Sequence, residues 1–176
     1  TDGPLPSTFQ YNANGDQTSG VINGVQRNID YTSYSKPKKI RQQDNIIDFY
    51  YDADRNSFER VDQTATTKTT TLYLGGLELV THQDNKGSVT EQKHHIGAHT
   101  IYIESTDGKK NTYELLHDNI GSLTDITDAN SNVVQHFCYT PFGEQIQTKG
   151  DHPDYPITHR GFTGHEEIEK VKLIHM

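Results

Sequence analysis

The feature that most constrains the fold is a repeat at the start of the chain. Residues 9–15 (FQYNANG) recur as 49–55 (FYYDADR), and 29–34 (IDYTSY) lie halfway between, so the period is 20 residues. Each copy alternates apolar and aromatic residues, passes through an Asn, Asp or Gly cluster, and alternates again. Such alternation is typical of strands, and the cluster is typical of tight turns. Each repeat therefore predicts a β-hairpin, and the hairpins must pair into a strip to bury their apolar faces.

Strand patterns continue beyond the repeats, separated by turns rich in Gly, Asn and Asp. The predicted strands there are 69–74, 78–82, 99–104, 112–116 and 133–139. One short helix is expected at the end, because Thr163 and Glu166 have capping-box spacing before EIEKVKL. The sequence thus predicts an all-β strip of antiparallel hairpins with one short C-terminal helix. We treat 1–176 as a single fragment, with repeats in 1–62 and a second region in 63–176.

Composition limits the possible partners. Apolar residues make up 31% of the chain, and 24 acidic residues against 16 basic ones give a net charge of −8. This charge repels phosphate backbones, so we expect no nucleic-acid partner, and no apolar run is long enough for membrane insertion. The first residues lack the pattern of a signal peptide, and the lone Cys138 cannot form an internal disulfide. We therefore expect synthesis in a reducing cytosol and export by another route.

The order of the motifs resembles a known family. The repeats, such as 51–54 (YDAD), resemble the YD repeats of bacterial Rhs proteins and of insecticidal toxin-complex C subunits. The second region resembles the Rhs repeat-associated core. The motifs that carry this likeness are 116–122 (LHDNIGS), 127–134 (TDANSNVV), 139–144 (YTPFGE), and 161–166 (GFTGHE) with 173–176 (LIHM).

The resemblance implies a large β-sheet ribbon that encloses a toxin domain until delivery. It also implies that the chain ends before the family's self-cleavage region and toxin domain, so the likeness assigns no catalytic residue. The expected role is structural, as part of the shell of a secreted effector that serves bacterial competition through type VI secretion or a toxin complex. Arg55 stands where the repeat usually has Gly, which leaves the local turn open, and Thr140 stands where the core usually has Asp.

Histidines raise two candidate sites. His95 and His99 have the i, i+4 spacing of a helical zinc site, but Gly97 and the β-rich residues after it favour loop and strand, where that spacing does not converge. His165 with Glu166, joined by His117 and Asp118, has the residue types of an acid/base site. A helix cap formed by Thr163 and Glu166 explains the same residues without chemistry.

The remaining candidates also have structural explanations. His136 lies two residues from Cys138 on one strand face, yet a thiol within an apolar alternation is expected to be a buried filler. The repeated tyrosines suit cross-strand ladders as well as a sugar platform. Gly75-Gly76 and Gly121-Ser122 lack the Lys and the helix of a phosphate loop. We therefore expect no catalytic residue, no metal site and no cofactor, so the chain is not expected to be an enzyme by itself.

Two alternatives stay open: participation in proteolytic self-processing of the parent effector, and a module that binds carbohydrate or protein. The expected partners are the rest of the parent Rhs polypeptide and its toxin domain. An isolated strip would also expose strand edges, so self-association into a dimer or a larger oligomer is expected.

Overall fold

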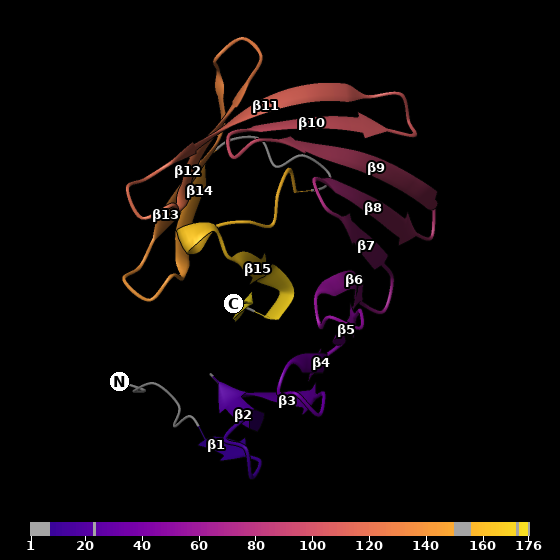
Figure 1. The fold of residues 1–176 in the computed structure, drawn as a ribbon, viewed down its shortest axis with the longest axis vertical. Helices are drawn as coiled ribbons and strands as arrows, with labels where there is room; N and C mark the ends of the chain where they lie inside the picture. The colour runs from indigo at the N-terminus through magenta and orange to yellow at the C-terminus, as the bar shows by residue number, and fades with distance from the viewer. Residues whose placement is uncertain (1–7, 23, 150–155, 172, 176) are drawn as a thin grey trace. The chain divides into compact units, whose positions relative to one another are not determined.

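The computed structural model describes residues 8–22, 24–149, 156–171 and 173–175. Fourteen antiparallel strands form one sheet in which every neighbour is also the next strand along the chain (Figure 1). The chain divides into two compact units, residues 1–91 and 92–176, which are described separately. The predicted all-β strip of hairpins is therefore confirmed, while the division by motif at residue 62 stays a prediction.

The first unit holds eight strands and the beginning of a ninth. They are β1 (Thr8–Tyr11), β2 (Gln17–Ile22), β3 (Val25–Tyr31), β4 (Pro37–Gln42), β5 (Asn45–Tyr51), β6 (Ser57–Gln63), β7 (Lys68–Leu74), β8 (Leu77–Asp84) and β9 (Gly87–Ile96).

The second unit holds the rest of β9, five further strands of the sheet and a small C-terminal hairpin. Its elements are β10 (Thr100–Ser105), β11 (Lys110–His117), β12 (Leu123–Asp128), β13 (Val133–Tyr139), β14 (Gln145–Lys149), the 3-10 turns η1 (Phe162–Gly164) and η2 (Glu169–Val171), and the pair β15 (Glu166–Ile168) and β16 (Leu173–His175).

One type of turn recurs along the sheet. Its first residue donates its N–H to the carbonyl four residues on, and its carbonyl accepts the N–H of the fourth residue. This is a type I turn closed by a bulge, and it needs a positive φ at the fourth position. Turns of this kind that join sheet strands begin at Asn12, Thr32, Asp52, Ser105, Asp118, Asp128 and Thr140. The first three lie 20 residues apart, as the repeat predicts.

The two positions that depart from the motifs of the family that the chain resembles do not disturb the turn. Arg55 adopts φ 67° and donates its N–H to the Asp52 carbonyl at 3.1 Å, so the turn left open at this position forms. Thr140 stands where the resembled motif has Asp, and its Oγ1 accepts the N–H of Glu144 at 3.1 Å. A hydroxyl therefore takes the place of a carboxylate as the acceptor in the turn.

We expect Gly108 to report the backbone requirement of this turn. Its φ is +89°, and a Cβ built there meets nothing within 4 Å, so only backbone strain opposes a side chain. Gly108→Ala should lower the free energy of unfolding by about 1 kcal/mol, and Gly108→Asn by less than half of that, because Asn tolerates left-handed φ. Urea unfolding of both variants checks this. Equal losses would contradict it.

The core of the second unit brings distant segments together. Its buried cluster consists of Ile101, Ile103, Leu115, Leu123, Ile126 and Ile157. Ile157 belongs to the C-terminal segment. Lys93 of β9 is buried, and its Nζ anchors this segment by donating hydrogen bonds to the carbonyls of Pro156 and Ile157. The same segment bonds to β12, since Leu123 N–H donates to the Gly161 carbonyl at 3.1 Å. Figure 1 shows η1 beside β12–β14.

The prediction of a C-terminal helix is wrong, because the region forms two 3-10 turns and a short strand pair. Thr163 has φ 50°, and its Oγ1 donates to the Phe162 carbonyl instead of capping a helix. Gly161 and Gly164 close the same two backbone bonds as the sheet turns, Gly161 N–H to His165 O and Gly164 N–H to Gly161 O. The following residues form β15, the single 3-10 turn η2 and β16. The glycines of this motif thus specify a turn, which competes with helix propagation.

Candidate functional site

The first unit buries one face of its sheet, and that face changes character along the strand order. Ile29, Ile40 and Ile47 lie opposite one another across β3, β4 and β5. Next in register come polar residues: Ile47 pairs with Asp62, and Phe49 pairs with Arg60. The buried face is therefore mostly apolar on β3–β5, where Arg27 is the buried charged residue, and mostly polar on β6–β8, where Val80 is buried as well.

Ion pairs and hydrogen bonds satisfy part of this polar region. Arg60 donates to Asp62 Oδ1 at 2.8 Å, with the two side chains only 3% and 6% exposed. His82 lies 3.4 Å from Glu91 Oε2 and 3.3 Å from Thr69 Oγ1. Buried charges need such partners, because an unpaired one loses its hydration without compensation. The contacts of His82 join β8 to β7 and β9 and so favour one register of these strands, whereas Arg60 and Asp62 pair within β6.

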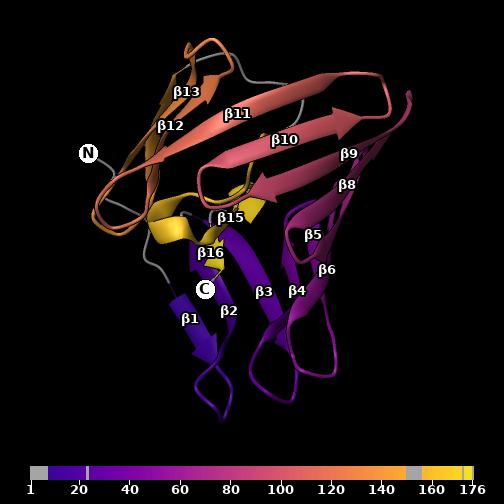
Figure 2. The same cartoon turned by 45° about the horizontal axis from the view of Figure 1, so that its top comes forward.

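The turns of the first three repeats contact each other along one edge of the sheet (Figure 2). Ser35 Oγ donates to Asp16 Oδ2 at 3.1 Å, and Lys36 Nζ donates to the Arg55 carbonyl at 2.7 Å. Each bond joins the fifth residue of one turn to the fourth residue of the next turn, 19 residues further along the chain. The 20-residue period therefore produces a ladder of linked turns.

Tyrosines complete this ladder. The rings of Tyr34 and Tyr51 meet edge to face at 5.9 Å, Arg55 lies 5.1 Å from the Tyr34 ring centroid, and Lys36 lies 5.4 Å from that of Tyr51. The Tyr51 hydroxyl donates to the Pro37 carbonyl at 2.7 Å. Cation–π and edge contacts hold rings in place. The arrangement favours the cross-strand ladder over the sugar platform for these two tyrosines.

A tyrosine in the second unit repeats this contact. Tyr139 precedes the turn at Thr140, as Tyr51 precedes the turn at Asp52, and its hydroxyl donates to the Leu123 carbonyl at 2.9 Å. Burial raises the pKa of Tyr139 far above its usual range, and the nearby Glu167 raises it further. The hydroxyl therefore stays protonated and remains a donor.

The turn at Asp128 predicts a pH effect. Hydrogen bonds from Asn132, first from its side chain, hold the pKa of Asp128 below its ordinary 3.8. A depressed pKa means that the stabilisation is fully present above pH 3.8 and is lost as the pH falls through the lower folded value. We expect Asn132→Ala to return the Asp128 titration midpoint towards 3.8, measured by NMR of the carboxyl carbon. The exposed control Asn111→Ala should not move it, and a wild-type midpoint at or above 3.8 would contradict the account.

The histidines weighed as a candidate zinc site lie on different elements. His94 and His95 belong to β9, while His99 lies in the turn before β10, so the predicted loop-and-strand geometry is confirmed. The His94 ring lies 5.9 Å from the Tyr102 ring, and the His99 ring lies 5.5 Å from the His117 ring. In the described part of the chain, no three His, Cys, Asp or Glu side chains are grouped as a metal site.

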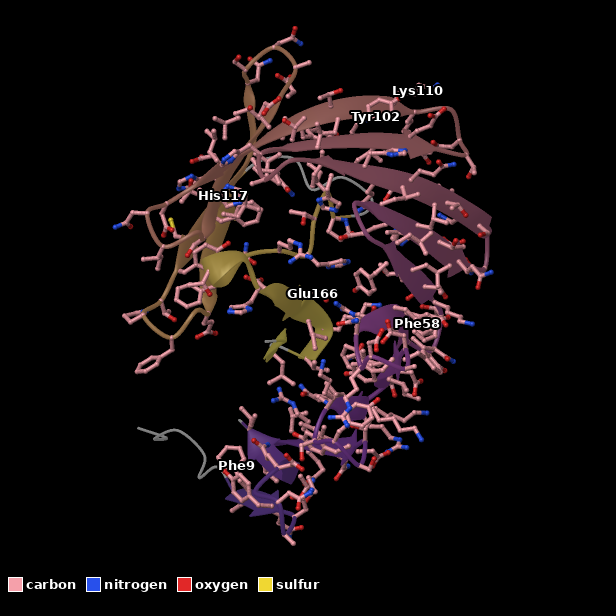
Figure 3. The ribbon with its side chains drawn as sticks, in the orientation of Figure 1. Phe9, Phe58, Tyr102, Lys110, His117 and Glu166 are labelled. Carbon is pink, nitrogen blue, oxygen red and sulfur yellow. The ribbon has the colours of Figure 1, made fainter. Side chains whose placement is uncertain are left out.

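The members of the second histidine candidate have separate structural roles in the described part of the chain. Asp118 serves its own turn, since its Oδ1 accepts the N–H groups of Ile120 and Ser122. Burial, followed by the charge of His99, lowers the pKa of His117, whose position at the end of β11 is marked in Figure 3. Glu166, also marked there, forms an isolated β-bridge with Arg160.

Cys138 departs from the expectation of a buried filler. The residue is half-buried, and its Sγ lies 3.4 Å from His136 Nε2. His136 Nδ1 lies 2.7 Å from Asp125 Oδ1, a residue that the sequence reading did not single out. Asp125 is 13 residues from Cys138 along the chain, so only the pairing of β12 with β13 reveals it.

The glycine pairs also have structural roles. Gly75 has φ 68° in the tight connection between β7 and β8, and Gly121 has φ 83° in the turn before β12.

None of the helices within the described ranges is long and apolar enough to cross a membrane.

The fold is shared with solved toxin-complex structures. The chain superposes on a chain of the TcdB2-TccC3-Cdc42 crystal structure with a TM-score of 0.77, 18% identity, and coverage of 89% of this chain and 8% of that one. The fold is that of a toxin-complex chain segment. A chain of TcdB2-TccC3 without its hypervariable C-terminal region gives a TM-score of 0.70 and 14% identity, with coverage of 91% of this chain and 11% of that one. A chain of the Photorhabdus luminescens Tc holotoxin pore gives a TM-score of 0.66 and 15% identity, with coverage of 92% of this chain and 11% of that one.

These likenesses concern the fold alone, because the identities are low. The chain spans only 8% to 11% of the lengths of the chains it matches. No protein-family model matches it, and no curated protein matches it. The β-strip is therefore established as an architecture, and its role requires a proposal.

Proposed function

We propose that the chain is a wall segment of a larger Rhs-type bacterial toxin protein, and that the wall encloses a toxin domain of the same polypeptide. The observation that carries the proposal is the match over 89% of this chain to a small part of a toxin-complex chain. The motif order of the Rhs repeats and core points in the same direction. Containment, and not catalysis, is the proposed mechanism.

The topology suits a wall that extends. Within the fourteen-stranded sheet every strand pairs with its neighbours along the chain, so a hairpin that precedes β1 can join without any change in strand order, while β14 leaves a second edge at which another hairpin can pair. The linked turns and the paired polar face then keep successive hairpins in register. The rest of the parent polypeptide is the proposed neighbour at both edges. Delivery by a type VI machine or a toxin complex, export from the bacterial cytoplasm, and a role in bacterial competition are parts of the same proposal.

Protease protection tests containment. In the polypeptide encoded by the complete gene, domains outside this chain should resist protease until denaturant opens the wall. Asp62→Ala should lower the denaturant concentration at which they become cleavable, whereas the exposed Asp30→Ala should not. Cleavage of the other domains at the same rate with and without the wall would reject the proposal.

The isolated chain should self-associate, because β1 and β14 lie at the two ends of the strand order. Light scattering at tens of micromolar protein should show a dimer or larger species. A sharp monomeric mass would overturn this part of the proposal.

The contact of Cys138 with His136 favours one second candidate, participation in self-processing. Cys138→Ala in the complete polypeptide should then abolish the processed product, with His165→Ala as a second variant. Normal processing of both would remove this candidate and leave containment intact.

A further inference from the structure

The outer side of β12 and β13 carries a chain of three side chains joined end to end. Cys138 Sγ lies 3.4 Å from His136 Nε2, and His136 Nδ1 lies 2.7 Å from Asp125 Oδ1. The imidazole thus stands between the thiol and the carboxylate. Such an order is typical of a nucleophile, its base and the group that orients the base. A metal site would instead need the three side chains to converge on one point.

Strand pairing places these groups together. His136 and Cys138 are two residues apart on β13 and therefore share a face, and Asp125 pairs directly with His136 from β12. Their neighbours Ile126 and Gln135 also pair with each other, and both are buried. The three side chains consequently lie on the face opposite the core. The His136 side chain is 40% exposed and that of Asp125 is 26% exposed, so small molecules can reach the group.

The contacts assign the roles. Asp125 accepts a hydrogen bond from the N–H of His136 Nδ1, which leaves Nε2 of the neutral ring with a lone pair directed at the thiol. Nε2 can therefore take the thiol proton, and the carboxylate stabilises the imidazolium that forms. A thiolate, and not a thiol, is the nucleophile in cysteine chemistry.

We propose that Cys138 is a nucleophilic modification site that undergoes thiol–disulfide exchange with low-molecular-weight disulfides. The proton of Cys138 moves to His136 Nε2, and the thiolate attacks one sulfur of the disulfide. The bond between the two disulfide sulfurs breaks as the bond to Cys138 Sγ forms, and the leaving thiolate takes the proton back. Cys138 is oxidised to a mixed disulfide while one sulfur of the reagent is reduced to a thiol, so no further oxidant is needed.

Disulfides fit this open strand better than acyl groups do. Acyl transfer creates an oxyanion that needs donors placed around it. Exchange instead expels a thiolate, which is already a stable anion, so one activated thiol on an exposed strand suffices. This inference does not depend on the proposed wall function.

Reaction with 4,4′-dipyridyl disulfide, which is small and uncharged at neutral pH, tests the proposal. Cys138 is the single cysteine, so the released pyridinethione reports on it alone. At neutral pH the rate constant of His136→Gln should be roughly tenfold below that of the wild type, and Asp125→Asn should lie between them. His94→Gln, a matched change at another strand histidine, should leave the rate unchanged.

Two further measurements keep the test independent of folding and access. Circular dichroism shows whether His136→Gln or Asp125→Asn has lost the sheet. If one of them has, the rate constant of the other variant tests the proposal. A thiol without activation reacts faster once unfolding exposes it fully. The native wild type should instead react faster than the same protein unfolded in urea, because only the folded chain holds His136 beside Cys138. Equal rates for wild type, His136→Gln and Asp125→Asn, or a native rate below the unfolded one, would overturn the proposal.

Discussion

Replacing Asp62 by Ala should lower the free energy of unfolding by about 3 kcal/mol. Arg60 and Asp62 are both nearly inaccessible, and the 2.8 Å contact joins the guanidinium to the carboxylate. Removing the carboxylate takes the charged group at 2.8 Å away from a guanidinium that water reaches poorly, so the hydration that Arg60 lost on folding is less fully compensated. The loss should shift the urea unfolding midpoint of the variant well below that of the wild type.

The exposed pair of Arg41 and Asp30 provides a matched control. The distance is nearly the same, 2.9 Å, but the side chains are 46% and 51% exposed. Asp30→Ala should therefore cost less than about 1 kcal/mol. The double change Arg60→Met with Asp62→Leu should recover most of the loss, because it removes both charges. Similar losses for Asp62→Ala and Asp30→Ala would contradict the burial of the polar face.

Ile126→Ala should cost about 3 kcal/mol, because the side chain is fully buried in the core of the second unit and its removal leaves a cavity. Ile120→Ala makes the same chemical change at a residue that is 57% exposed. It should change the unfolding free energy by less than about 0.5 kcal/mol. Chemical unfolding followed by circular dichroism measures both. Equal losses of unfolding free energy for Ile126→Ala and Ile120→Ala would contradict the burial of Ile126 in this core.

The hairpins of the repeats could be predicted because local chemistry specifies them. The alternation of side chains and the Asn, Asp or Thr before each turn act within a few residues, so the 20-residue period survives even where Arg55 replaces Gly. The C-terminal motif shows the limit of such signals. Thr163 and Glu166 have the spacing of a cap, but two glycines with turn hydrogen bonds determine the local backbone.

Strands β9 and β12 escaped prediction for a different reason. The sequence of β9, GSVTEQKHHI, has no apolar alternation, because its buried position 93 is a lysine that bonds to the carbonyls of residues 156 and 157. β12 has Thr124 and Asp125 between its buried positions Leu123 and Ile126. Polar residues of this kind are stable in a sheet only through partners far along the chain, and these partners are invisible in a local pattern.

The same limit applies to the candidate sites. The sequence placed His136 and Cys138 on one face, which the structure confirms, but it favoured a buried thiol. The exposure of this face and the position of Asp125 follow from strand register, which short-range patterns do not specify. The buried pair of Arg60 with Asp62 was hidden for the converse reason, since charged residues in a strand usually indicate a solvent-facing side.

Electron cryomicroscopy of the polypeptide encoded by the complete gene tests the central claim most directly. We predict a closed wall with a hollow interior, in which residues 8–149 form one continuous strip, further hairpins pair with β1 and β14, and a separate domain lies inside. A solid domain, or a barrel closed by pairing of β1 with β14, would contradict the account.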